Sequence, residues 1–308
     1  MSAVQELTTR RRDPREIQSQ ALALPRGRQL ALAARPRIMG VLNVTPDSFS
    51  DGGLWLDPEA AVARGLEMLR EGADLLDLGA ESTRPGGGVY GGGADPVPAD
   101  EELRRLLPVL TRLRAATDAP LSVDTRKPEV AREALLAGAD LINDVTGLSD
   151  AAMRAVVGEA GCPAIVMHAR GDLPTMQRQI RFADVVAEVA GELARSVERA
   201  VADGVPRERL LVDPGIGFGK TAEHNLALLR NLAALHDLGC PVVVGASRKS
   251  FISAVSDGGP DERLGGSLAA VGWAALQGVA VVRVHDVAAT AQFLRLWEAI
   301  AGAGENDR

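Results

Sequence analysis

Aromatic residues, cysteines and long hydrophobic runs are all scarce in this sequence. Aromatic side chains make up 3% of the 308 residues, which argues against a core or an interface built on stacked rings. No apolar stretch approaches the roughly 18 residues of a membrane span, and the N-terminus lacks the hydrophobic core of a signal peptide. The net charge of −7 provides no general attraction for nucleic acid or for an anionic membrane. We therefore expect a cytoplasmic protein without nucleic-acid or membrane partners.

Metal-binding patterns are missing as well. The two cysteines, Cys162 and Cys240, each precede a proline and an apolar run, so we expect small buried residues at strand starts rather than a disulfide or a metal pair. The four histidines are scattered, and no spacing of histidines, cysteines and carboxylates resembles a zinc site. A tightly built metal cage is not expected.

Lysine is also rare, because arginine supplies nearly all of the positive charge. The only lysines are Lys127, Lys220 and Lys249, and each follows the end of a predicted strand. In so arginine-rich a chain, each remaining lysine is a candidate for a role that needs a compact ammonium group. Chance placement is the alternative.

What the sequence does contain, from Arg37 onward, is a repeated unit of a short apolar run, a polar cluster and a longer stretch with helical spacing. Short apolar runs between helices are typical of parallel strands, which are covered on both faces. Eight runs occur, at 38–44, 75–80, 120–125, 141–145, 164–169, 210–215, 241–247 and 281–286, with helical stretches that include 58–73, 100–116, 127–139, 183–204 and 222–238. Eight such units favour a single (β/α)8 TIM barrel of the α/β class over an open doubly wound sheet.

The domain organisation follows from the same pattern. Two short apolar segments around Pro25–Gly27 predict an N-terminal hairpin that leads into the first barrel strand. We expect the hairpin and barrel to span residues 21–302. The polar, arginine-rich residues 1–20 and the short stretch 303–308 are expected to be flexible tails.

Polar residues follow the apolar runs, and strand ends of a barrel converge on one mouth. Asp124, Asn143 and Asp213 end three of these runs. Carboxylates beside an amide suit a ligand with a cyclic guanidine-like edge, because aspartate accepts paired N–H donors and asparagine both donates and accepts. Helix N-capping is the alternative role for such residues.

Arg283 and His285 alternate along the last run, so both are expected to face the mouth. With the backbone N–H groups of the following helix and Asp286 as its cap, they form a predicted anion site suited to a diphosphate.

The glycine-rich run Gly215–Thr221 resembles a nucleotide-binding loop only superficially. Pro214 stands where a Walker A loop needs glycine, and the glycine spacing also differs from that of dinucleotide-binding folds. We interpret the run as a turn that allows backbone to approach a flat ligand closely.

Eight strings in order resemble the dihydropteroate synthase family, a pterin-binding TIM-barrel family, between Arg37 and about Glu298. They are VLNVTPDSFSDGG, ESTRPGG, SVDTRKPEV, INDVTG, MHARG, LLVDPGIGFGKT, GASRKSF and RVHDV. The resemblance implies a transferase of folate biosynthesis that condenses 6-hydroxymethyl-7,8-dihydropterin diphosphate with 4-aminobenzoate, acts as a homodimer and is a sulfonamide target. It also implies Mg²⁺, held with the diphosphate.

The resemblance implies roles for particular residues. Asp124, Asn143, Asp213 and Lys249 correspond to the family's pterin-recognising groups, and Met167 to an apolar wall of that pocket. The catalytic residues that the resemblance implies are Asp124, Asp213, Lys249, Arg283 and His285. Arg283 and His285 resemble the diphosphate clamp, with Asn43 as the Mg²⁺ ligand. The surroundings of 4-aminobenzoate correspond to Phe49, Thr83, Arg84, Pro85, Phe218 and Ser250.

Two departures from the family pattern stand out. A glycine-rich insertion, Gly87–Gly93, follows the TRPG motif and puts loop closure in question, and Ala80 replaces a common glycine, a change we expect the barrel to absorb. Two alternatives therefore stay open. One is a pterin-binding methyltransferase, which shares the Asp/Asn/Asp set, and the other is a pterin-binding paralogue without turnover.

Overall fold

The structure, a computed structural model, describes residues 21–32, 35–45, 57–81, 97–171, 176–177 and 180–302. Several predictions concern residues outside these ranges: both tails, Phe49, Thr83, Arg84, Pro85 and the insertion Gly87–Gly93. Within the described ranges, no helix combines the length and the hydrophobicity needed to cross a membrane.

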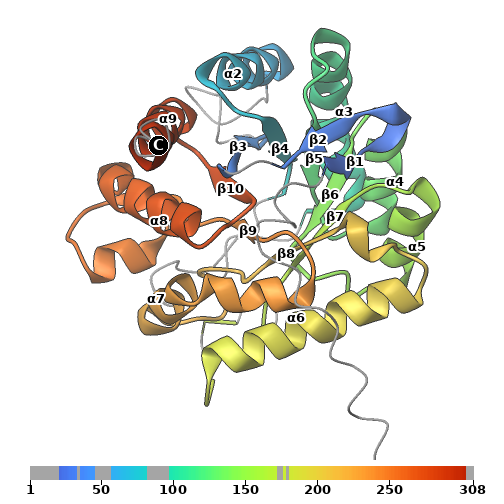
Figure 1. Cartoon of the computed structure of the whole chain (residues 1–308). Coiled ribbons are helices and arrows are strands. Elements are labelled where there is room, and N and C mark those ends of the chain that lie inside the picture. Colours follow the sequence, from blue (N-terminus) through green and yellow to red (C-terminus); the bar gives the residue numbers. More distant parts are fainter. Residues whose placement is uncertain are drawn as a thin grey trace, which may run out of the picture.

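Eight parallel strands form the centre of the molecule, with helices around them (Figure 1). The strands are β3 (Arg37–Asn43), β4 (Leu75–Gly79), β5 (Leu121–Asp124), β6 (Leu141–Asp144), β7 (Ala164–Met167), β8 (Leu210–Asp213), β9 (Val243–Val244) and β10 (Val281–Val284). The helices are α2 (Pro58–Glu71), α3 (Ala99–Ala116), α4 (Pro128–Leu136), α5 (Ala151–Ala160), α6 (Val185–Ala202), α7 (Ala222–Arg230), α8 (Leu264–Leu276) and α9 (Val287–Gly302). Each of the eight predicted strands is confirmed.

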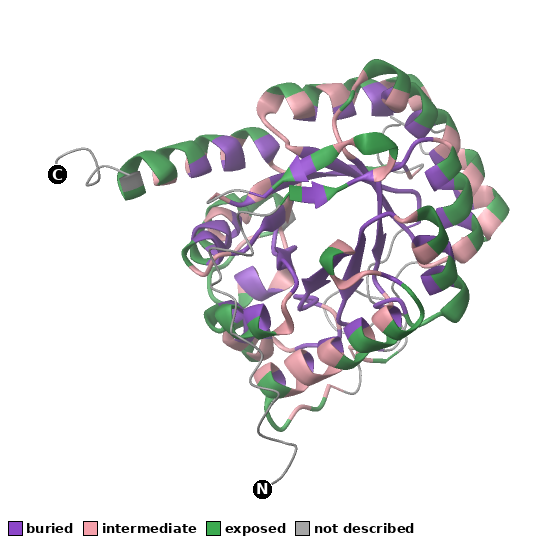
Figure 2. Cartoon of the chain, turned by 45° about the vertical axis from the view of Figure 1, so that its right-hand side comes forward, coloured by how far each residue is buried: buried purple, intermediate pink, exposed green. Residues whose placement is uncertain are grey.

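The strands pair in chain order, and β10 lies between β3 and β9. A parallel bridge between Val212 and Val242 joins β8 to the start of β9, so the sheet closes on itself. The strands are buried on both faces, whereas the helices are exposed on their outer sides (Figure 2). The prediction of a (β/α)8 barrel over an open sheet is therefore confirmed.

Alternation along the strands decides what faces the barrel interior. In β4, Leu75, Asp77 and Gly79 share one face, because side chains alternate in a strand. Leu75 belongs to an inner apolar cluster at the strand starts, which also includes Met39, Leu141, Ile165, Leu211, Val243 and Val281. The inner residues nearer the strand ends are mostly polar. The interior is thus apolar at the N-terminal end and polar at the C-terminal mouth.

The predicted N-terminal hairpin exists and covers the apolar end. Strands β1 (Ala21–Ala23) and β2 (Gln29–Ala31) pair antiparallel on either side of a 3-10 turn, Pro25–Gly27. The buried hairpin leucines, Leu22, Leu24, Leu30 and Leu32, belong to the same cluster as the first inner residues of the strands. This end of the barrel is therefore closed by the chain itself.

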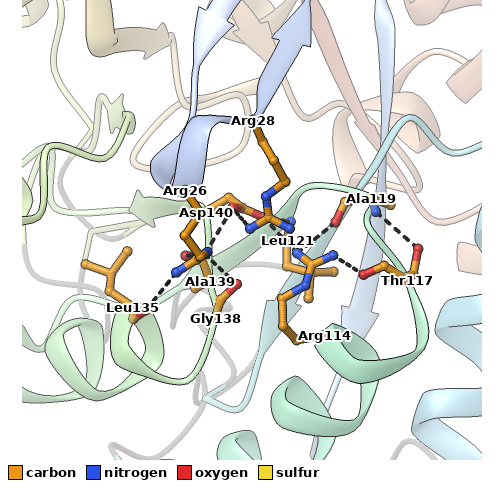
Figure 3. Close-up of polar contacts among 10 residues, drawn as sticks. All are labelled: Arg26, Arg28, Arg114, Thr117, Ala119, Leu121, Leu135, Gly138, Ala139 and Asp140. Carbon is orange, nitrogen blue, oxygen red and sulfur yellow. Dashed lines mark hydrogen bonds and ion pairs between the residues drawn. The ribbon is translucent and has the colours of Figure 1, made fainter.

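An ionic cluster fastens the hairpin to the barrel (Figure 3). Asp140, which is fully buried, accepts hydrogen bonds from Arg26, Arg28 and Arg114, and from the Leu121 backbone N–H at 3.0 Å. The Arg26 guanidinium also donates to carbonyl oxygens just after α4, at 2.9 Å for Gly138 and 2.7 Å for Ala139. Two hairpin arginines thus bind one carboxylate from the barrel wall, and we name this group the Asp140 cluster.

Three smaller predictions can be compared with the structure. Both cysteines are buried and unpaired, as expected. The stretch 222–238 is not one helix, because α7 ends at Arg230 and a 3-10 segment, Leu232–Leu238, follows. Asn231 lies at the break, where its side-chain N–H donates to the Ala227 carbonyl at 2.8 Å and competes with the regular helical pattern. Ala80 is buried in the hydrophobic core, so its side chain fits within the barrel, as expected.

Candidate active site

The polar mouth has a carboxylate at its centre that the sequence interpretation missed. Asp77, on β4, is completely buried. Its Oδ2 accepts a hydrogen bond from Arg283 Nε at 2.6 Å and from Asn143 Nδ2 at 3.1 Å. Arg283 Nη2 also donates to Asp124 Oδ2 at 3.0 Å. Side chains from β4, β5, β6 and β10 therefore meet in one network.

Two carboxylate oxygens of this network have no partner among the described residues. They are Oδ1 of Asp77 and Oδ1 of Asp124. The nearby Ser122 hydroxyl, on the inner face of β5, also has no partner in the described part of the chain. Buried acceptors without donors destabilise a protein unless a ligand or an ordered water satisfies them. The network is therefore prepared to receive N–H donors from a bound molecule.

Burial also changes the protonation of Asp124. Desolvation raises its pKa to about 7, although the neighbouring Arg283 lowers it and Asp77 raises it further. Asp124 is therefore a group that changes charge near neutral pH, a property common at functional sites.

Asp213 and Lys249 form the other side of the mouth. Burial raises the pKa of Asp213, against the influence of Lys249 and of the Gly215 N–H that its Oδ1 accepts at 2.7 Å. Burial lowers the pKa of Lys249 to about 8. A Cβ on Gly245 would lie 3.9 Å from Lys249 Nζ and 3.7 Å from Arg283 Cβ, so these two cations share one wall. Asp213, Lys249 and Arg283 thus lie on one face, as predicted.

The backbone at Arg248 turns Lys249 toward this mouth. Arg248 has a left-handed φ of +59°, which is unusual for a residue with a side chain. Its N–H donates to the Ser267 hydroxyl at 2.9 Å, its carbonyl accepts from Arg263 at 2.9 Å, and its Nε donates to Asp286 at 2.9 Å. Contacts on three sides hold the strained conformation in place.

The predicted anion clamp is only partly charged. His285 lies beside Ser247, with Nδ1 3.1 Å from the hydroxyl oxygen. Burial, followed by the charges of Arg283 and Arg248, lowers the pKa of His285 to about 4. Its imidazole is therefore neutral at pH 7 and acts as a hydrogen-bonding group. The carboxylate of Asp286, predicted as a helix cap, is paired with Arg248.

Helix capping, the alternative role for the strand-end residues, falls to other side chains. Side chains cap α2, α5, α6 and α7, and these caps are Asp57, Asp150, Asp184 and Thr221. Asp144 bonds Thr146 and Leu148 in the turn after β6. Asp124 instead accepts a hydrogen bond from Arg283 within the mouth, and Asn143 donates one to Asp77 there.

The remaining predicted residues occupy the rim and walls. Met167 ends β7 and is buried, and Phe218 is half-buried with its ring centroid 4.8 Å from Lys249 Nζ. Ser250 begins a 3-10 turn, Ser250–Ala254, after Lys249. Asn43 ends β3 and is exposed at the mouth.

Comparisons with known proteins agree with this arrangement. The sequence profile of the family described as pterin binding enzyme matches residues 39–285. Dihydropteroate synthase from Escherichia coli K12 is 44% identical over 275 residues, which are 89% of this chain and 95% of that protein. A structure of Xanthomonas albilineans dihydropteroate synthase with 4-aminobenzoic acid is 48% identical, has a TM-score of 0.84, and matches 92% of this chain and 98% of that one. The chain belongs to the dihydropteroate synthase family.

Further structures of dihydropteroate synthases with bound molecules are also similar to this chain. The X. albilineans enzyme has been solved with 7,8-dihydropteroate, at 44% identity and a TM-score of 0.80 over 92% of this chain and 99% of that one. A relative from Thermus thermophilus, 48% identical with a TM-score of 0.79 over 91% of this chain and 100% of that one, contains 4-aminobenzoate. This chain is thus an enzyme of the transferase class, with the fold predicted from its sequence.

Proposed function

We propose that this chain condenses 6-hydroxymethyl-7,8-dihydropterin diphosphate with 4-aminobenzoate, giving 7,8-dihydropteroate and diphosphate. The observation that carries the proposal is the network of Asp77, Asp124, Asn143 and Arg283, in which two buried carboxylate oxygens receive no donor from the residues that the structure describes. A pterin has a cyclic guanidine-like edge whose N–H groups match such acceptors. The family membership supplies the reaction.

Different residues of the mouth bind the pterin and stabilise the charge that develops on it. Asp124, Asn143 and Asp213 bind the pterin edge, and Lys249 contacts the ring from the side of Phe218. As the diphosphate leaves the methylene carbon, positive charge develops on the pterin. Buried carboxylates stabilise that charge electrostatically. The amine of 4-aminobenzoate then forms the new C–N bond and loses a proton.

Arg283, His285 and the N-terminal amides of α9 are proposed to stabilise the departing diphosphate. A guanidinium and free backbone N–H groups are suited to phosphate oxygens. Since the Arg283 guanidinium already pairs with Asp77 and Asp124, it links the pterin and diphosphate ends of the pocket.

A magnesium ion fits this site if it arrives with the diphosphate. The described residues contain no cluster of three or more metal-binding side chains, and Mg²⁺ usually needs only one or two protein oxygens. Asn43 offers an exposed amide oxygen at the mouth, at the end of the strand that pairs with β10. The bound ion would neutralise charge on the leaving group.

A diphosphate-release assay tests the proposal. Purified protein, dihydropterin diphosphate and Mg²⁺ should release diphosphate only when 4-aminobenzoate is present, and chelation of Mg²⁺ should stop the reaction reversibly. Arg283→Ala should reduce kcat by about 100-fold or more, as expected when transition-state charge loses a stabilising donor. Release that is independent of 4-aminobenzoate would contradict the condensation, and near-normal turnover of Arg283→Ala would contradict the clamp.

The same proposal includes a cytoplasmic homodimer. Two glycines of α8 pack within the chain, because a Cβ on Gly266 would lie 2.3 Å from Ile252 and one on Gly272 would lie 2.8 Å from Phe293. The outward apolar side chains of α8, Trp273 at 48% exposure and Leu276 at 68%, are therefore better candidates for contact with a second copy. Light scattering of the purified protein measures the oligomeric state, and cell fractionation tests the compartment.

A further inference from the structure

Lys220 lies outside the substrate-facing network but is only 3% exposed. Its Nζ lies 2.9 Å from His168 Nδ1, 3.0 Å from the Gly215 carbonyl oxygen and 2.9 Å from the Phe218 carbonyl oxygen, with the His168 carbonyl oxygen farther away at 3.4 Å. An ammonium group has three N–H donors, one for each of the three nearest acceptors. A neutral amine has two, so loss of the proton would remove one of these three hydrogen bonds.

The turn that Lys220 holds, residues 215–219, packs directly on the chain that follows β7. Gly215 and Gly219 both have left-handed φ angles, +65° and +62°. A Cβ on Gly215 would lie 1.9 Å from the His168 carbonyl oxygen, and one on Gly219 would lie 2.7 Å from that of Arg170. Glycine is required at both positions, because any side chain would separate the two segments.

The same turn reaches the active site through Lys249. The Ile216 carbonyl accepts a hydrogen bond from Lys249 Nζ, and the Phe218 ring lies against the same ammonium. The Gly215 N–H donates to Asp213 Oδ1. A shift of the turn would therefore move Lys249 relative to Asp213.

His168 connects Lys220 to the outer helix layer. Its Nε2 lies 3.0 Å from Glu192 Oε2 on α6, and Glu192 also pairs with Arg170. For Nδ1 to accept from Lys220, the imidazole must be neutral with its proton on Nε2, which then donates to Glu192. Burial and the charge of Lys220 lower the pKa of His168 to about 4, in agreement with a neutral ring.

We propose that Lys220 is a positioning residue for pterin binding, whose ammonium, anchored through His168, holds the 215–219 turn and thereby sets Lys249 in place. This inference rests on the proposed function, because the ligand whose affinity it predicts is the pterin substrate.

The charges around Lys220 determine its pH dependence. Burial has the largest effect and lowers its pKa to about 7; Asp213 and Glu192 favour the charged form, whereas Lys249 and Arg170 oppose it. The three-donor ammonium is therefore present below about pH 7 and lost above it. Lys249 and Asp124 also titrate in this range, so a single pH profile cannot isolate Lys220.

The test is the ratio of two affinities measured across pH. Isothermal titration with 6-hydroxymethyl-7,8-dihydropterin diphosphate gives Kd for the wild-type protein and for Lys220→Met between pH 6 and pH 9. We expect the variant to bind about 10- to 100-fold more weakly at pH 6, the range for lost hydrogen bonds to a charged group. The difference should shrink several-fold by pH 9, where the wild-type amine is neutral. A merely structural role would give a ratio that does not change with pH.

Lys127→Met is the matched control. Lys127 is also largely enclosed, with Nζ 2.9 Å from Glu81 and paired with Glu102, so its ammonium is held by carboxylates and not by the 215–219 turn. The ratio of the Kd of Lys127→Met to the Kd of the wild-type protein should not change with pH. A ratio that varies as much for Lys127→Met as for Lys220→Met would overturn the inference, as would equal affinity of Lys220→Met and wild type at pH 6.

A second measurement keeps the inference testable if Lys220→Met does not fold. Nitrogen NMR of the wild-type protein, labelled at its four histidines, reports the ring tautomers. His168 should carry its proton on Nε2, and its Nδ1 signal should shift as Lys220 loses its proton near pH 7. A proton on Nδ1 would refute the proposed arrangement. Failure of the wild-type protein to bind the pterin would overturn the proposed function and this inference with it, whereas binding with a pH-independent ratio would overturn this inference alone.

Discussion

Replacement of Asp140 by alanine should loosen the hairpin that closes the barrel. Asp140 is fully buried, and it is the carboxylate shared by Arg26, Arg28 and Arg114 in the Asp140 cluster. Removal of one partner from a buried ion pair costs about 3 to 5 kcal/mol. Arg26 is 44% exposed, so solvent screening reduces the contribution of its ion pair to this free energy.

The loss of the carboxylate also leaves the Leu121 N–H without its acceptor, a further effect of about 1 to 3 kcal/mol. The two effects overlap, and we expect Asp140→Ala to lower the free energy of unfolding by about 4 kcal/mol in total. Since native proteins are stable by about 5 to 15 kcal/mol, this is a large fraction. For a domain of this size, it corresponds to a fall in Tm of roughly 10 °C.

Urea unfolding followed by circular dichroism measures the change, and hydrogen exchange locates it. Exchange should accelerate most at residues 21–32, where the hairpin is attached. Glu159→Ala is the control, because Glu159 pairs with Arg132 at 3.3 Å on the surface, with the two side chains 66% and 55% exposed. Its effect should stay below about 1 kcal/mol. If Asp140→Ala were no less stable than Glu159→Ala, the Asp140 cluster would not anchor the hairpin as argued.

Three further predictions concern the site and the assembly. Asp77→Asn keeps the shape but removes the charge facing Arg283, so steady-state kinetics should show kcat/KM reduced by about 10-fold or more; an unchanged kcat/KM would contradict this role. Because burial raises the pKa of Asp124 to about 7, kcat/KM for the pterin should rise with pH up to that value as the carboxylate forms, and Asp124→Asn should lack this rise. For the proposed homodimer, Trp273→Lys should give a monomer in light scattering, and a particle of wild-type size would exclude this face as the contact between the two copies.

Much of the fold could be predicted because each strand of a barrel is covered on both sides. Such strands are short and apolar, and the residue types change abruptly where they end, so Asp124, Asn143 and Asp213 were recognisable at their tips. Asp77 was not, because it lies inside an apolar run and not at its end. The available signal was alternation: in β4, Asp77 shares its face with Leu75 and Gly79. A charged residue on the inner face of a barrel strand is itself an indication of function.

Other features of the site depend on contacts that one sequence does not reveal. The Arg283–Asp77 bond joins residues 206 positions apart. The direction of Lys249 depends on a left-handed Arg248, and such a conformation is not expected where no glycine stands. The neutral state of His285 likewise follows from burial beside two arginines, which are brought together only in the folded chain.

The hairpin at the N-terminal end of the barrel, opposite the mouth, determines where ligands can enter and leave. With that end filled by leucines, both reactants and both products must pass through the same opening. A ligand bound to Asp77 and Asp124 then occupies the deepest position, and a second ligand bound nearer the rim blocks its release. The shape of the barrel alone therefore constrains the order in which ligands bind and are released.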